Sequence, residues 1–156
     1  MESDKDVGDA WRRLGSDDGG GDREDLLRPR TDLNDGEVNR ICDVVREAAF
    51  GLHRYLGPGF RERVYENGLV HRCRKAGLHV AQQPRVLVHD EDGTLLSEEK
   101  MDVVVERVII VENKAKPIVT DADVAQLLGY LKATGFRHGL LINFGAPRFH
   151  IKKYVR

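Results

Sequence analysis

The stretch from Val108 to Lys116, VIIVENKAK, decides how the rest of the chain can fold. An apolar run precedes two charged side chains, Glu112 and Lys114, and strand alternation places both charges on one face. The apolar run indicates a buried strand, where isolated charges are costly. Such a carboxylate and ammonium either pair with each other, hold a metal ion or take part in chemistry. The residues on either side must distinguish these three possibilities.

The charge of the chain is distributed unevenly. Its 156 residues suit one domain with a substantial core. Residues 1–35 are rich in charge and glycine and have few apolar anchors, so we predict a disordered acidic tail there and one folded domain over residues 36–156. The tail holds eleven of the 26 acidic and six of the 25 basic residues, which leaves the predicted domain with a charge of about +4. This excess is compatible with a polyanionic partner, although many ordinary domains carry as much.

The cysteine content and hydropathy indicate the compartment. Cys42 and Cys73 have no CxxC partner, so the sequence predicts neither a zinc site nor a disulfide framework. No apolar run is long enough to cross a bilayer, and the N-terminus lacks the basic and apolar regions of a signal peptide. We therefore expect a reduced, cytoplasmic setting and no membrane partner.

The apolar spacing predicts the order helix, helix, three strands, helix, two strands. Apolar steps of three and four predict two helices before the first strand, at Glu37–Tyr55 and Phe60–Ala76, and a third between the third and fourth strands, at Asp121–Thr134. Alternation predicts three antiparallel strands and then two more, at 79–90, 95–106, 108–115, 138–145 and 148–155. Pro84 inside the first of these strands indicates an edge position or a bulge.

Three acidic residues and one lysine fall on neighbouring predicted elements. Glu62 lies on the second helix, Asp102 on the second strand, and Glu112 and Lys114 on the third. Adjacent strands could bring Asp102 beside Glu112, where two carboxylates repel each other unless a cation relieves them. Oxygen ligands favour magnesium or manganese over zinc. A metal of this kind activates water while a lysine neutralises developing charge, so these residues suit phosphodiester hydrolysis.

Asp102, followed ten residues later by Glu112, Asn113 and Lys114, resembles the PD-(D/E)XK nuclease superfamily in its spacing and order of elements. The segment Gly59–Tyr65, GFRERVY, also matches the signature that names the GxxExxY proteins, a branch of that superfamily. The resemblance covers the chain from Glu37 onwards. It implies an α/β domain with the αβββαβ restriction-endonuclease-like core, in which helices flank a mixed central sheet.

The resemblance also assigns roles to the charged residues. It implies that Asp102 and Glu112, together with Glu62, bind Mg²⁺ or Mn²⁺, and that Lys114 assists at the scissile phosphate. It thereby implies a nuclease acting on nucleic acid, for which we expect DNA. Small nucleases of this fold often resemble halves of a dimer, which suggests a homodimer.

Two further positions match RecB-like members of the superfamily, and two positions depart from the PD-(D/E)XK motif. Gln126 and Tyr130 match the QxxxY element of RecB-like members, in which these side chains contact the substrate. No proline precedes Asp102, so the literal PD pair is absent. Asn113 fills a position that is more often apolar, and the sequence offers no reason for it.

Simpler interpretations compete with this site. Glu112 and Lys114 could form a partly exposed ion pair at a strand end, which contributes little to stability. Glu66, one helical turn beyond Glu62, is a rival for the helical carboxylate. The chain could also be a non-catalytic nucleic-acid- or protein-binding module that retains the fold, or a hydrolase of small phosphodiesters.

Overall fold

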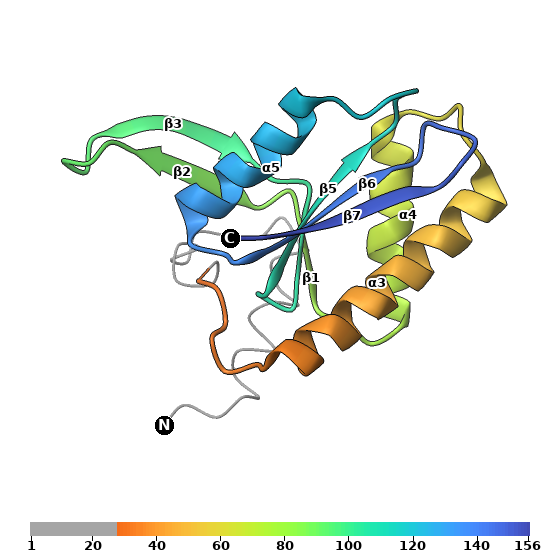
Figure 1. The fold of residues 1–156 in the computed structure, drawn as a ribbon, viewed down its shortest axis with the longest axis horizontal. Helices are drawn as coiled ribbons and strands as arrows, with labels where there is room; N and C mark the ends of the chain where they lie inside the picture. Colours follow the sequence, from red (N-terminus) through yellow and green to blue (C-terminus); the bar gives the residue numbers. More distant parts are fainter. Residues whose placement is uncertain (1–27) are drawn as a thin grey trace, which may run out of the picture.

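A five-stranded mixed sheet with helices on both faces forms the body of the computed structural model, which describes residues 28–156 (Figure 1). The elements in chain order are α3 (Asp35–Leu56), α4 (Glu62–Lys75), β1 (Val80–Gln82), β2 (Arg85–His89), β3 (Leu95–Lys100), β4 (Val103–Val105), β5 (Ile109–Lys114), α5 (Asp121–Thr134), β6 (His138–Asn143) and β7 (His150–Val155). The sheet order is β1-β4-β5-β6-β7, in which only β5 and β6 run parallel. This arrangement confirms the predicted mixed α/β fold.

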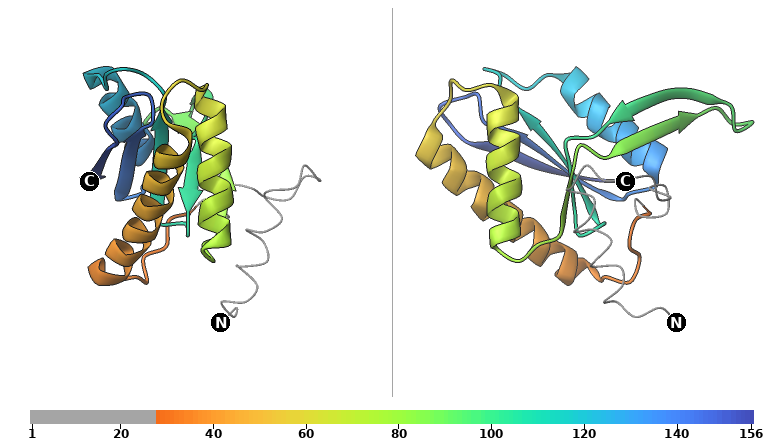
Figure 2. Two further views of the ribbon diagram at one scale, coloured as in Figure 1. Left: turned by 90° about the vertical axis from the view of Figure 1, so that its right-hand side faces the viewer. Right: turned by 180° about the vertical axis from the view of Figure 1, so that it is seen from behind.

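Strand β5 is the central strand of the sheet, and its side chains are therefore buried on both faces. Ile109 and Val111 pack in one core with α3 and α4, whereas Ile110 packs in a second core with α5. Figure 2 shows the two layers of helices on opposite sides of the strands. Helix α5 is the crossover between parallel β5 and β6, so its first turn lies close to the end of β5 where the charges are.

Two of the three expected antiparallel strands are each broken into two pieces. Residues 79–90 form β1 and β2, separated by Gln83 at a φ of 54° and by Pro84, which cannot donate to a ladder. Residues 95–106 form β3 and β4, separated next to Asp102. The pieces β1 and β4 stay in the main sheet, whereas β2 and β3 form a separate ribbon that projects from the body (Figures 1 and 2). Asp102 therefore lies where the ribbon leaves the sheet, not inside a strand as expected.

The predicted tail, residues 1–35, lies for the most part outside the described residues. The part that is described runs beside the turn between β4 and β5, where the N–H of Arg30 donates to the carbonyl of Arg107 at 2.8 Å. The disorder of the tail and the boundary at residue 36 stay predictions. No helix within residues 28–156 is long and apolar enough to span a membrane.

Candidate active site

Asp102 and Glu112 face each other at the point where β4 begins. Because β4 begins at Val103, the amide of Asn113 in β5 has no strand partner on that side, and it donates instead to Asp102 Oδ2 at 2.8 Å. In return, the N–H of Asp102 donates to Glu112 Oε1 at 3.3 Å. Because the strand is broken here, each carboxylate accepts a backbone hydrogen bond: Asp102 from Asn113, and Glu112 from Asp102.

Burial makes this pair of carboxylates difficult to ionise together. Glu112 is only 2% exposed, and its burial, followed by the charge of Asp102, raises its pKa to about 8. Burial also raises the pKa of Asp102, while the amide of Asn113 and the charge of Lys114 act in the opposite direction. Two carboxylates in such a position tolerate one negative charge more readily than two. A divalent cation would relieve both groups.

Lys114 lies one pleat beyond Glu112 on the same face of β5. Its Nζ donates to Gln126 Oε1 at 2.7 Å and lies 4.0 Å from Asp123 Oδ1. Asp123 in turn is held by Lys116, whose Nζ lies 2.8 Å from its Oδ2. Within residues 28–156, Lys114 and Glu112 form no ion pair. Since Glu112 is also buried, the structure argues against an exposed ion pair at this strand end.

Gln126 and Tyr130 connect Lys114 to the base of the ribbon. The two residues lie one turn apart on α5, and Gln126 Nε2 donates to the hydroxyl of Tyr130 at 3.2 Å. That hydroxyl donates to the carbonyl of Lys100 at 3.2 Å. The structure thus brings both residues to the site, with bonds that are internal to the protein. Their contact with substrate stays a prediction.

Glu62 approaches the same site from the first turn of α4. Its pKa is raised by burial first and by the charge of Asp102 next, so the two carboxylates interact. Glu62 forms no hydrogen bond with another residue of the described chain. Glu66, by contrast, is 3% exposed and accepts a hydrogen bond from Gln83 Nε2 at 2.8 Å. Of the two glutamates, Glu62 is the one left available for a ligand.

The signature tyrosine, Tyr65, fixes the loop that leads into α4. Its ring is buried and stacks on Phe144 with a centroid distance of 4.8 Å. Its hydroxyl donates to the carbonyl of Gly57 at 2.6 Å and accepts from the N–H of Phe60 at 3.2 Å. These bonds fix the start of α4, and hence the position of Glu62, its first residue. Tyr65 therefore has a packing role, not a chemical one.

The side chain of Asn113 has no hydrogen-bond partner among the described residues of the site. Its side chain is fully buried on the face of β5 that it shares with Val111, opposite Glu112 and Lys114. Neither its Oδ1 nor its Nδ2 has a hydrogen-bond partner within the described chain. A buried amide without partners costs about 1–3 kcal/mol. Only its backbone N–H contributes to the site, and nothing in the structure explains the asparagine side chain.

The predicted metal site is only partly assembled. In residues 28–156, no three acidic, histidine or cysteine side chains converge closely enough to cage an ion by themselves. Asp102 and Glu112 nevertheless fit as two carboxylate ligands, because the raised pKa of each shows that both cannot readily ionise without a cation. Magnesium usually keeps several waters and binds through one or two carboxylates plus substrate phosphates, so two ligands suffice. Metal binding by Glu62 stays a prediction.

Comparison with known proteins gives one match. A family model described as the PD-(D/E)XK nuclease superfamily matches residues 39–155. No curated protein and no solved structure matches the chain. The matched region runs from α3 into β7 and includes all six predicted site residues, which are Glu62, Asp102, Glu112, Lys114, Gln126 and Tyr130.

Proposed function

We propose a function for this chain from its family, since it belongs to the PD-(D/E)XK nuclease superfamily. The proposed function is that of a divalent-metal-dependent nuclease that hydrolyses phosphodiester bonds of DNA. The observation that carries this proposal is the pairing of the half-buried Asp102 with the buried Glu112, which has Lys114 on the same face of β5. Two adjacent carboxylates, one of them buried, are costly to ionise together unless they bind a cation. We further place the chain in the GxxExxY branch, on the strength of its Gly59–Tyr65 segment.

The residues divide the work between metal and phosphate. Asp102 and Glu112 would hold Mg²⁺ or Mn²⁺, with Glu62 as a third carboxylate. A divalent cation at this position supplies a more acidic bound water and a Lewis acid for a phosphoryl oxygen. Raised pKa values favour this use, because a cation restores the ionised form that burial disfavours.

Lys114 serves the scissile phosphate. The carboxamide of Gln126 holds its ammonium on the α5 side of the site, 2.7 Å from Oε1. An ammonium fixed in a partly buried position stabilises the extra negative charge that a phosphodiester acquires during attack. Gln126 still has one amide hydrogen for a substrate oxygen, whereas the hydroxyl of Tyr130 is largely buried and already paired. Direct substrate contact is therefore proposed chiefly for Gln126.

The setting and assembly extend the proposal. Cys42 and Cys73 are both buried free thiols, which suits a reduced cytoplasmic compartment. By analogy with other small nucleases of this fold, we propose a homodimer that brings two such sites to one substrate. Light scattering in solution would test the dimer independently of activity.

A panel of cleavage assays tests the nuclease proposal. Purified protein is incubated with Mg²⁺ or Mn²⁺ and with single-stranded DNA, duplex DNA or RNA. We expect cleavage of DNA, and a loss of about 100-fold or more in rate for Lys114→Ala and for Glu112→Gln. Lys75→Ala, at the exposed end of α4, is the matched lysine control and should behave as wild type. Intact substrates under every condition, or full activity in both variants, would refute the proposal.

One observation favours a second function, a non-catalytic module that binds nucleic acid or a protein. The described residues contain no preformed cage of three metal ligands. Calorimetry distinguishes the two functions, because a nuclease binds Mn²⁺ through Asp102 and loses that binding in Asp102→Asn. A module would show no such metal binding, while its affinity for nucleic acid would still fall steeply with salt.

A further inference from the structure

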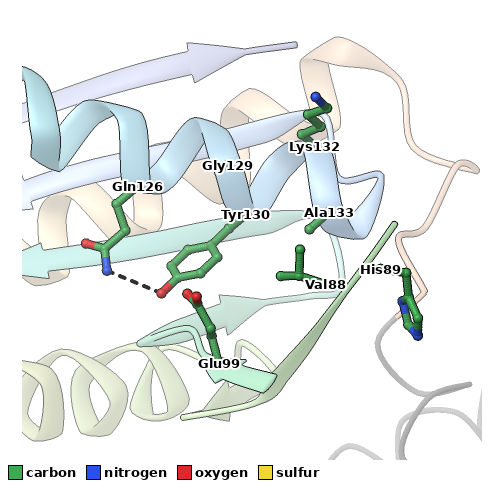
Figure 3. A pocket seen from close by; sticks show the side chains of 8 residues that line it. All are labelled: Val88, His89, Glu99, Gln126, Gly129, Tyr130, Lys132 and Ala133. Atoms are coloured by element: carbon green, nitrogen blue, oxygen red, sulfur yellow. Dashed lines mark hydrogen bonds between the residues drawn. The ribbon is translucent and has the colours of Figure 1, made fainter. Parts of the chain in front are cut away.

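A groove of about 540 Å³ opens between α5 and the ribbon of β2 and β3 (Figure 3). Gln126 and Tyr130 line it, and both also belong to the candidate active site. This ribbon groove therefore begins beside Lys114 and continues away from it along the helix. Its volume lies in the range of sites that hold one small ligand.

The two ends of the ribbon groove differ in chemistry. Glu99 lies at the end near Gln126, where a carboxylate and a carboxamide can hydrogen-bond a polar ring edge (Figure 3). Lys132 and His89 lie towards the opposite end, Lys132 on the α5 side and His89 on the ribbon side. Between the ends the walls are apolar, with Val88 on the ribbon side.

The helical wall of the groove carries no side chain at Gly129. A Cβ built at Gly129 meets no atom within 4 Å, so this stretch of α5 presents backbone to open space. Ala133, one turn further, adds only a methyl group. A flat, apolar strip of helix opposite Val88 leaves room for a planar ring.

We propose that the ribbon groove binds one unpaired nucleotide of the substrate, next to the phosphate held at Lys114, so that the substrate class is single-stranded nucleic acid. The base lies on the strip at Gly129, Glu99 accepts from amino groups on its edge, and Lys132 meets the next phosphate. This inference rests on the proposed nuclease function and narrows its substrate.

The size and polarity of the groove favour a single strand over a duplex. A paired base carries its partner strand and has its hydrogen-bonding edge occupied, so it offers no free edge to Glu99. An unpaired base leaves that edge free for Glu99, and each base that stacks on a protein surface contributes substantially to the binding of single strands.

Filling the groove tests the inference. Gly129→Leu places a side chain in the open space, whereas Ala125→Leu adds a leucine on the same helix at an exposed position outside the groove. Binding of a fluorescein-labelled single-stranded oligonucleotide is measured by anisotropy in Ca²⁺, and its cleavage in Mn²⁺. We expect Gly129→Leu to weaken binding about tenfold or more and to slow cleavage, with Ala125→Leu close to wild type.

The following outcomes decide whether the ribbon groove binds an unpaired nucleotide. Equal binding by Gly129→Leu and Ala125→Leu, or tighter binding of wild type to duplex than to single strand, would overturn the ribbon-groove inference even if DNA is cleaved. Ala133→Leu is a second groove-filling variant with the same expected loss, in case Gly129→Leu folds poorly by circular dichroism. If wild type cleaves nothing but Gly129→Leu still weakens single-strand binding, the nuclease proposal fails and the groove assignment stands.

Discussion

Glu112 carries a carboxyl group that its surroundings keep protonated when no cation is bound. Its folded-state pKa is raised by burial to about 8, against 4.5 for an ordinary glutamate. A raised pKa means that the folded state binds the proton more tightly than the unfolded chain does. The stabilisation is therefore complete below about pH 4.5 and is lost as the pH rises towards 8.

This linkage predicts that the protein in EDTA becomes less stable between pH 5 and pH 8. Each unit of pKa shift corresponds to about 1.4 kcal/mol, so the loss should reach a few kcal/mol. Glu112→Gln should flatten the pH dependence, because glutamine does not titrate, and it should also remove the gain in Tm that Mn²⁺ gives wild type at pH 8. Identical slopes for wild type and Glu112→Gln in thermal melts would contradict this assignment.

Asn113 supplies the site with its backbone only, so its side chain should be replaceable. Asn113→Val removes two buried polar atoms that have no partner and introduces a residue that favours strands. We expect the free energy of unfolding to rise by about 1–3 kcal/mol, measured by urea titration, with cleavage retained. Val111→Asn, on the same face of the strand, is the converse control and should destabilise. A loss of cleavage in Asn113→Val would show that the amide does more than fill space.

Strand alternation alone sufficed to place Glu112 and Lys114 on one face, because a period of two is independent of tertiary context. It could not show that Lys114 bonds Gln126 in preference to Glu112, since that choice depends on how α5 crosses back over the sheet. Nor could it separate Glu62 from Glu66. Both lie on one helical face, and only the position of Gln83 after the strand break commits Glu66.

At the scale of elements, the break in two strands was only half visible in the sequence. Pro84 indicates an edge position or a bulge, because proline lacks a backbone donor. The matching break next to Asp102 carries no comparable signal. The break next to Asp102 follows from strand pairing. The amide of Gln83 donates to the carbonyl of Asp102 at 2.8 Å, so the distorted backbone at Gln83 also distorts the partner strand. That distortion is what frees Asp102 to meet Glu112.

Asn143 joins the end of β6 to the segment that follows β5, and so supports Lys114. Its Oδ1 accepts from the amides of Lys116 and Gly145 at 3.2 and 3.0 Å, and its Nδ2 donates to the carbonyl of Lys116 at 2.8 Å. The side chain is 2% exposed. Truncation would leave several buried backbone groups unpaired at the edge of the site.

Asn143→Ala should therefore lower the free energy of unfolding by about 3 kcal/mol and reduce cleavage by more than the loss of folded protein explains. Urea titration gives the first quantity, and rates measured well below the unfolding midpoint give the second. Asn67→Ala, which removes one exposed hydrogen bond to Gln82, should cost less than about 1 kcal/mol and leave cleavage unchanged. Equal effects of the two alanines would contradict a supporting role for Asn143.

At the scale of the whole molecule, some residues before the predicted boundary at residue 36 contact the sheet and cap α3. Arg107 Nε donates to the carbonyl of Arg28 at 3.1 Å, so the chain already contacts the sheet there. Asn34 caps α3 through a reciprocal pair in which it accepts from the amide of Glu37 and Glu37 accepts from the amide of Asn34. Composition could not reveal these contacts, because short capping and pairing segments are as polar as a tail.

Two truncations test where the folded body begins. A chain that starts at residue 28 should unfold within about 0.5 kcal/mol of the full chain, because residues 1–27 are acidic, rich in glycine and short of apolar anchors. A chain that starts at residue 36 loses the cap from Asn34 and the bond from Arg30 to Arg107, and should be less stable by about 2 kcal/mol. Both are measured by urea titration at one protein concentration. Equal stability of the two truncations would put the boundary at residue 36, whereas a loss already at residue 28 would assign a stabilising role to residues 1–27.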